Sequence, residues 1–214
     1  MKKGLHATYG LTAAAVLFFV PLFIIRGIGW FDFWWWMSIN LIMLISMSWI
    51  IDRPGAVSME GQDADGAGKK IILGIASAVF LYLVFFIGNI LSRKIFPFAS
   101  AGIDSVYGFR GGASSMRIAV LMLLIIGPGE EVFWRGFIQR RYQEHLGGWK
   151  GFLVATGIYA AVHLGSGNIM LVLAALTCGL FWGFLYLRYR SMMLNIISHV
   201  IWDISVFLLF PFSG

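Results

Sequence analysis

The 214-residue sequence contains one cysteine, Cys178, which excludes a disulfide bond within the chain. Because Cys178 lies inside an apolar run, we expect its thiol to be buried and inert. Charged residues are also scarce, since they make up 12% of the sequence, whereas a soluble domain has about 25%. The shortage of charge excludes an ordinary water-soluble domain and favours a protein that lies in a membrane.

Acidic residues are fewer than basic ones, with 10 Asp and Glu against 16 Lys and Arg. The resulting net charge of +6 does not predict a nucleic-acid partner, because most basic residues lie at the ends of apolar runs, where they set membrane orientation. The sequence also lacks internal repeats and heptad patterns. The partner that the composition predicts is therefore the lipid bilayer.

Hydrophobic residues make up 59% of the chain and gather in long runs. A helix needs roughly 17–25 residues to cross a bilayer, so the short first and fifth runs leave a count of about seven spans, within the range 6–8. We expect an all-α fold, a polytopic transmembrane helix bundle, with residues 1–214 as one integral-membrane domain. The runs are Gly10–Ile25, Phe31–Ile51, Ile71–Leu91, Ile118–Gln139, Phe152–Leu164, Ile169–Leu187 and Met192–Phe210.

Lys and Arg predict how the bundle is oriented in the cell membrane, because they are enriched on the cytoplasmic side. A cytoplasmic N-terminus and seven spans place ten basic residues inside and five outside, which favours this orientation and an external C-terminus. The inside residues are Lys2, Lys3, Arg53, Lys69, Lys70, Arg140, Arg141, Lys150, Arg188 and Arg190. The outside residues are Arg26, Arg93, Lys94, Arg110 and Arg117.

Two long connections interrupt the apolar runs. The segment Asp52–Lys70 is polar and Gly-rich, which predicts a flexible loop. The segment Ser92–Arg117 mixes aromatic residues with Gly and Ser, and it either lies on the membrane surface or covers a cavity. The cluster Trp34–Trp36 opens the second run, where indole rings favour the headgroup level, so we expect it to anchor the helix there.

The segment Gly127–Arg141 carries charges at the depth of the bilayer. Each charge there costs roughly 2.5–3.5 kcal/mol, so such residues usually face a bundle interior and mark function. Glu131 and Arg135 are four residues apart, which favours an ion pair on one helix face. Glu130 is rotated by about 100° from Glu131, so it is left to meet another helix. The preceding Gly-Pro-Gly is expected to break or kink the helix.

Two later apolar runs carry further ionisable residues: His163 in the fifth, and His199 and Asp203 in the seventh. His199 and Asp203 are four residues apart and share one helix face. These residues, with Glu130 and Glu131, predict either a site for water activation or polar pairs that only tie helices together. We favour the site, because ionisable groups occur on three separate spans.

Three motifs, each in its own apolar segment, resemble the CPBP family of intramembrane proteases, which comprises type II CAAX prenyl endopeptidases and bacteriocin-processing proteins. In order, they are Glu-Glu-x-x-x-Arg, completed by Phe-Trp-Arg-Gly, an aromatic residue followed by x-x-x-His, and His-x-x-x-Asp. The resemblance covers about Ile118–Phe210, which would form a protease-like core of residues 118–210. It implies an all-helical enzyme that hydrolyses a peptide bond within or near the membrane.

The resemblance also implies a role for each matching residue. Glu130 with His163 would activate the attacking water, and His199 with Asp203 would polarise the scissile carbonyl and hold the oxyanion. Glu131 and Arg135 would orient and support the site.

The sequence departs from the family at two positions. Tyr159 stands where the family usually has Phe, which adds a hydroxyl donor. Asp203 stands where many members have Asn, and an ionised Asp would repel an oxyanion, so Asp203 must be protonated, orient His199 or bind a metal. We favour a mechanism without a metal, and a divalent metal such as zinc is the alternative. Its candidate ligands are Glu130, His163, His199 and Asp203.

We therefore expect an intramembrane endopeptidase whose substrate is a membrane-associated peptide or protein. One alternative is a membrane immunity or binding protein of the same fold that cuts nothing. Another is an ion-coupled transporter, since membrane-buried acids and histidines also form relays, but the lack of an internal repeat disfavours it. Prenylated C-termini, leader peptides and sorting-signal tails all remain compatible as substrates.

Overall fold

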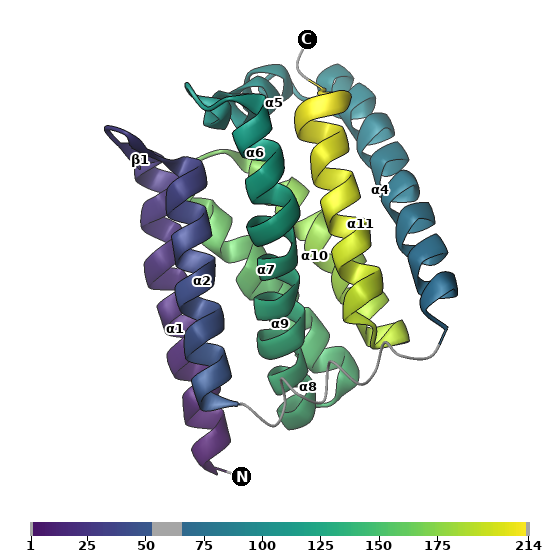
Figure 1. Ribbon diagram of the computed structural model, residues 1–214. Helices are drawn as coiled ribbons and strands as arrows, with labels where there is room; N and C mark the ends of the chain where they lie inside the picture. The colour runs from purple at the N-terminus through teal and green to yellow at the C-terminus, as the bar shows by residue number, and fades with distance from the viewer. Residues whose placement is uncertain (1, 53–65, 213–214) are drawn as a thin grey trace.

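The computed structural model of the protein describes residues 2–52 and 66–212. Its long helices lie side by side as a bundle, and α1 begins at the opposite end from the end of α11 (Figure 1). The loop that we expected to be flexible, Asp52–Lys70, lies mostly outside the described residues, as do Arg53 and the side chains of Lys2 and Lys3. The long helices are α1 (Lys2–Ile25), α2 (Phe33–Ile51), α4 (Ala67–Ile95), α10 (Ile169–Tyr189) and α11 (Met192–Ile204).

The shorter helices complete a bundle that is almost entirely helical, as the sequence predicted. Among the described residues, five helices are long and apolar enough to cross a membrane, and a bent pair, if it is taken as one span, raises the number to six. The pair joins residues 99–110 and 115–146 at an angle of 89°. The fifth apolar run forms α9 (Gly148–Val162), which has 15 residues and is too short for a full span. This shortfall explains the difference between seven and six, and the count is five when the bent pair is not taken as a span.

The central helix of the bundle runs through residues 115–146 without the break that we expected at Gly-Pro-Gly. Instead, two wider π-helical stretches lie on either side of α7 (Gly127–Glu130), at Met122–Ile126 and Glu131–Gln139. Proline lacks an N–H and its ring crowds the preceding turn. A π turn, in which the Gly127 N–H donates to the carbonyl of Met122, accommodates the proline without ending the helix. The flanking helices are α6 (Ser115–Leu121) and α8 (Arg140–Leu146).

Gly127 lies where this central helix closely approaches Val200 of α11. Gly127→Ala is expected to destabilise the protein by about 1–3 kcal/mol through overpacking, because the new Cβ would lie 2.6 Å from Cγ2 of Val200. The midpoint of thermal unfolding in detergent measures this effect. Gly157→Ala is the matched control, since its Cβ would meet no described atom within 4 Å and alanine favours a helix. Equal midpoints for the two variants would contradict the close approach.

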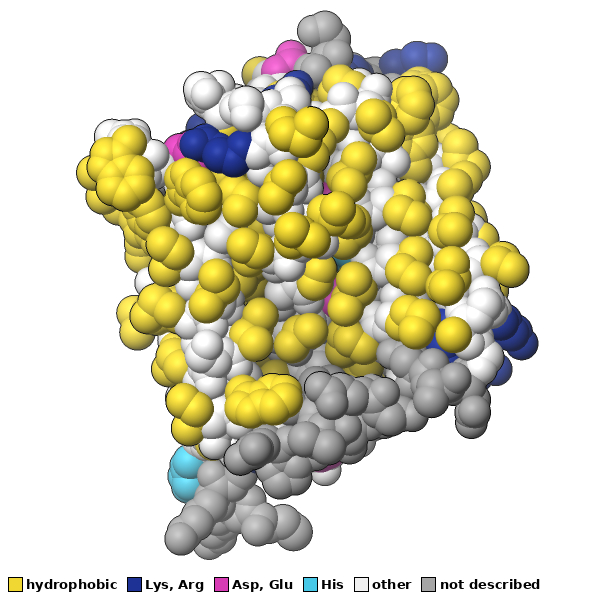
Figure 2. All heavy atoms as spheres, viewed as in Figure 1, with side chains coloured by type: hydrophobic (Ala, Val, Ile, Leu, Met, Phe, Trp, Pro, Cys, Tyr) yellow, Lys and Arg dark blue, Asp and Glu magenta, His cyan; other side chains and the backbone are white. Residues whose placement is uncertain are grey.

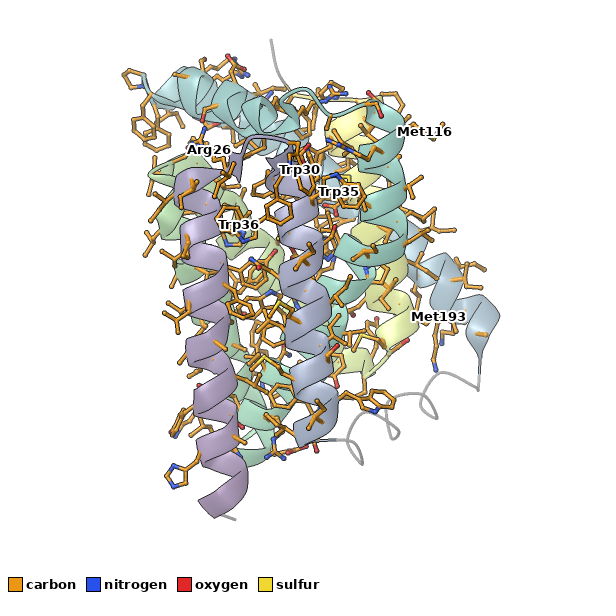
Figure 3. The ribbon with its side chains drawn as sticks, turned by 60° about the vertical axis from the view of Figure 1, so that its left-hand side comes forward. Arg26, Trp30, Trp35, Trp36, Met116 and Met193 are labelled. Carbon is orange, nitrogen blue, oxygen red and sulfur yellow. The ribbon has the colours of Figure 1, made fainter. Side chains whose placement is uncertain are left out.

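A short hairpin, β1 (Gly27–Ile28) and β2 (Phe31–Asp32), joins α1 to α2 and was not predicted. Asp32 caps α2 by accepting hydrogen bonds from the N–H groups of Trp34 and Trp35, and it also pairs with Arg117. Figure 3 shows Trp30 and Trp35 at this end of the bundle, far from Met193. Trp30 and Trp35 are exposed, whereas Trp34 is buried. Only part of the expected indole anchor therefore faces outward.

The face of the bundle that Figure 2 shows is largely apolar, and the basic side chains on it lie near the two ends. Helix α4 packs mainly on α11, where Gly74 allows a close approach to Ile197. Most of the remaining α4 surface is exposed and hydrophobic. Helices that face lipid have such surfaces, since hydrocarbon chains are as apolar as the side chains.

Candidate active site

One cavity of about 390 Å³ lies inside the bundle. Residues from three separate motifs line it, so the structure brings together the ionisable side chains that the sequence predicted as a site. Its apolar wall comes from α2, α4, α10 and α11, and from α5 (Ala99–Tyr107), which lies across one end of the bundle. The ionisable residues that line the cavity include Glu130, Tyr159, His163, Cys178, His199 and Asp203.

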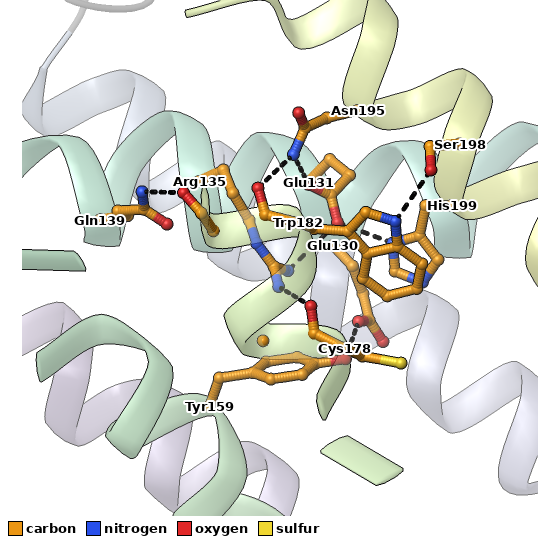
Figure 4. A network of polar contacts seen from close by, with 12 residues as sticks. Glu130, Glu131, Arg135, Gln139, Tyr159, Cys178, Trp182, Asn195, Ser198 and His199 are labelled. Atoms are coloured by element: carbon orange, nitrogen blue, oxygen red, sulfur yellow. Dashed lines mark hydrogen bonds and ion pairs between the residues drawn. The ribbon is translucent and has the colours of Figure 1, made fainter. Parts of the chain in front are cut away.

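Glu131 is fully buried and forms the centre of a polar network beside the cavity (Figure 4). The predicted ion pair with Arg135 is present, with 3.1 Å between Nη1 and Oε1. Two residues of α11 complete the network: Asn195 donates to Oε2 at 2.9 Å, and Nδ1 of His199 lies 2.7 Å from Oε1. Three donors thus surround one buried carboxylate, which is the condition under which a buried charge is tolerated.

Glu130, in contrast, lines the cavity and takes no part in the Glu131–Arg135 pair. The hydroxyl of Tyr159, on α9, donates to its Oε2 at 2.8 Å. Within the described part of the chain, no hydrogen bond to its Oε1 is present. Of the two adjacent glutamates, Glu130 therefore has an oxygen available to a molecule in the cavity.

Tyr159 also fixes His163, which begins a short 3₁₀ turn (His163–Ser166) at the end of α9. Nδ1 of His163 lies 2.8 Å from the carbonyl oxygen of Tyr159. Because a carbonyl only accepts, Nδ1 carries the hydrogen, and Nε2 of the neutral ring keeps its lone pair. The ring packs beside Phe23, with 4.5 Å between centroids. Tyr159 thus links Glu130 through its hydroxyl and His163 through its carbonyl.

His199 is held between two carboxylates and an indole ring. Its Nδ1 contacts Glu131, and its Nε2 lies 3.5 Å from Oδ2 of Asp203. The imidazole stacks on Trp182, with 3.6 Å between centroids and 19° between planes. The Trp182 indole N–H in turn donates to Ser198 at 3.1 Å. Each nitrogen of His199 therefore faces an acceptor, and the ring has little freedom to turn.

Sequence reasoning missed Asn195, Trp182 and Ser198 in this network. Asn195 lies four residues before His199 in an otherwise apolar run, and this spacing is a signal that could have identified it. Trp182 carries no comparable signal, because an aromatic residue in an apolar helix is ordinary. Cys178 is 4% exposed and thus buried as expected, but it lines the cavity, so its thiol is open to a reagent that enters the cavity rather than inert.

The alternative of a zinc site depends on how closely the candidate ligands gather. Nδ1 of His163 and Nδ1 of His199 are engaged by Tyr159 and Glu131, which leaves Nε2 of each ring as the atom that could bind a metal. Among residues 2–52 and 66–212, no three His, Cys, Asp or Glu side chains lie close enough to hold a metal ion. This arrangement does not fit a metal, so we derive no step through one.

Fold and site together define an all-helical membrane protein whose interior cavity is lined by acidic and imidazole side chains. Residues 112–205 match the type II CAAX prenyl endopeptidase Rce1-like family, so this part of the chain is an Rce1-like (CPBP) domain. The predicted resemblance is confirmed, and the matched residues contain all three motifs. Members of the family are peptidases. No curated protein and no solved structure matches the chain.

Proposed function

We propose that this protein is an intramembrane endopeptidase that uses Glu130 and His163 to activate water for hydrolysis of a peptide bond. The observation that supports this proposal is that Glu130, His163, His199 and Asp203 line a single cavity. Burying ionisable groups among membrane helices is costly, and helix packing alone does not require them around an open space. The match to a family of peptidases supports the same conclusion.

The attacking water binds between Oε1 of Glu130 and Nε2 of His163. The Tyr159 hydroxyl holds the other oxygen of Glu130, so Oε1 points to the water. As the water oxygen bonds to the carbonyl carbon of the substrate, its proton passes to Glu130, which acts as the general base. His163 orients the water by accepting its second hydrogen.

The oxyanion that forms on the carbonyl oxygen is stabilised by His199. Glu131 accepts the hydrogen on Nδ1, so His199 acts as the imidazolium, whose second hydrogen, on Nε2, faces the cavity. Asp203 lies beside Nε2 and orients the ring rather than contacting the oxyanion, which an ionised carboxylate would repel. The carbon–nitrogen bond then breaks as Glu130 returns the proton to the departing amine.

The substrate is a membrane-associated peptide or protein, and no nucleic acid is involved. Helices α2, α4 and α5 also line the cavity, which supports residues 1–214 acting as one domain around the core at 118–210. We infer a cytoplasmic N-terminus from the positive-inside rule. A reporter that is active only in the cytoplasm tests this orientation. It should be active when it is inserted between residues 53 and 65, and inactive when it is fused after Phe212.

Cleavage by purified variants tests the proposed activity. A set of peptides tethered to lipid vesicles is incubated with the protein, and products are identified by mass spectrometry. We expect cleavage by the unaltered protein and by His145→Ala, whose side chain does not line the cavity, and almost none by His163→Ala. Cleavage that survives in His163→Ala would contradict the role of this residue. The alternative, a membrane immunity protein that cuts nothing, predicts a different pair of results. The unaltered protein would cleave no peptide, and the His163→Ala variant would still protect cells.

Tyr159→Phe tests the hydroxyl that distinguishes this chain from most of the family. The substitution removes the hydrogen bond that the hydroxyl donates to Glu130. A hydrogen bond to a charged acceptor contributes roughly 1.5–3 kcal/mol. Because the backbone carbonyl that holds His163 is retained, we expect kcat to fall by about tenfold while KM stays unchanged. A KM that rises instead would indicate that the hydroxyl binds substrate.

A further inference from the structure

The segment Phe210–Phe212 lies at one rim of the cavity, apart from the catalytic groups. The π-helical turn Ser205–Leu209 follows α11 and ends at Leu209, and Pro211 cannot continue the helix. The segment then contacts α4 and α5, and Phe212 lines the cavity. Figure 1 shows that α5 and the ends of α4 and α11 meet at this end of the bundle.

Side chains of α4 and α5 hold the backbone of this segment. The Tyr82 hydroxyl donates to the carbonyl oxygen of Phe210 at 3.2 Å, and Nη2 of Arg93 donates to that of Phe212 at 2.8 Å. The hydroxyl oxygen of Tyr107 accepts from the Phe212 N–H at 2.7 Å. All three hydrogen bonds join these side chains to main-chain atoms of the segment. The main chain of another extended peptide that follows the same path could therefore form them.

The rim is built before any peptide arrives. Arg93 is fixed by Asn89, at 2.8 Å, and by Asp104, at 3.2 Å. Tyr107 is fixed because its hydroxyl donates to the carbonyl of Val206 at 3.1 Å. A rigid set of donors and acceptors lowers the entropic cost of binding a backbone.

The side chain at position 212 is the part of the segment that enters the site. The Phe212 ring stacks on Tyr82, with 5.1 Å between centroids and 29° between planes, and it lines the same cavity as Glu130. A large apolar residue at the equivalent position of another peptide would fill this space in the same way.

We propose that Tyr82, Arg93 and Tyr107 form a backbone-binding subsite for an extended apolar peptide, and that the segment Phe210–Phe212 occupies it as an internal competitor. This inference rests on the proposed peptidase function, because the peptide that displaces the segment is the substrate. The subsite favours a substrate with a large apolar side chain at the position of Phe212.

The single cysteine provides a test that does not depend on cleavage. Cys178 lines the cavity, so its rate of reaction with a small maleimide in detergent reports how open the rim is. Phe212→Ala is expected to raise this rate about fivefold. That change corresponds to a loss of roughly 1 kcal/mol from the free energy that holds the segment against the rim. Phe98→Ala is the control, since this exposed ring stacks on Phe96 and does not line the cavity. Equal rates for the unaltered protein and Phe212→Ala would overturn the proposal.

A separate peptide added to the protein tests whether the rim binds peptides, or whether the segment Phe210–Phe212 only closes the cavity. The amidated peptide Leu-Leu-Phe-Pro-Phe, which copies residues 208–212, should restore slow labelling of Cys178 in the Phe212→Ala protein. The same peptide with Ala in its last position should not, and protection should weaken about fivefold when Tyr107→Phe is combined with Phe212→Ala. Faster labelling without protection by the peptide would overturn the subsite, whatever the outcome of the cleavage assays.

Discussion

Replacing Glu130 with glutamine is expected to lower kcat for peptide hydrolysis by about 10²–10⁴-fold, the usual contribution of a general base. Glutamine has nearly the same shape and still accepts the hydrogen bond from Tyr159, but its amide cannot take a proton from water. Because Glu130 is outside the Glu131–Arg135 pair, the thermal unfolding midpoint should change little. Steady-state cleavage of a vesicle-bound peptide, with the unfolding midpoint measured on the same samples, gives both quantities.

Glu144→Gln is the matched control for this prediction. Glu144 lies on the same long helix, is solvent-exposed and pairs with Arg140 and Arg141 away from the cavity. It should cleave at the unaltered rate. A folded Glu130→Gln protein that cleaves as fast as Glu144→Gln would eliminate Glu130 as the base.

The second large effect is on stability, and it comes from the buried ion pair. Arg135→Ala should destabilise the protein by about 3–5 kcal/mol, because Glu131 would remain as a buried charge without its cation. The guanidinium also lies over the ring of Tyr159, at 4.8 Å from the centroid, so its loss removes packing as well. Equilibrium unfolding in mixed detergent micelles measures the change.

Two further variants show whether charge or packing causes the loss. Arg188→Ala removes an exposed arginine and should change the unfolding free energy by less than about 0.5 kcal/mol. The double variant Glu131→Gln/Arg135→Met removes both charges and should recover part of the stability that Arg135→Ala loses. If the Arg135→Ala and Arg188→Ala proteins had equal free energies of unfolding, the ion pair between Glu131 and Arg135 would not stabilise the protein.

The sequence predicted which residues would meet, because ionisable groups in apolar helices have few alternatives. The spacings of four that join Glu131 to Arg135 and His199 to Asp203 gave their shared faces directly, and both pairs are present. The sequence also predicted that the side chains of Glu130 and Glu131 point in different directions, because neighbouring residues are rotated about the helix axis. The structure agrees, since Glu130 lines the cavity and Glu131 does not.

Other features depend on tertiary packing and were not predictable from periodicity. Gly-Pro-Gly predicts a break, yet the chain stays helical there through the π-helical stretches on either side of it. The predicted ion pair between Glu131 and Arg135 is present, but Asn195 and His199 on another helix, which also donate to Glu131, were not predicted as its partners. The position of Trp182 against His199 depends on how α10 and α11 pack, and a single sequence carries no signal for this contact.

The central claim is that the cavity around these side chains admits water and is where the peptide bond is cleaved. Cys178 allows a direct test, because it is the only cysteine in the sequence and it lines the cavity. A small, water-soluble methanethiosulfonate should modify Cys178 and abolish cleavage at the same rate, whereas Cys178→Ala should be insensitive to the reagent. Complete modification of Cys178 with cleavage unchanged would contradict the account.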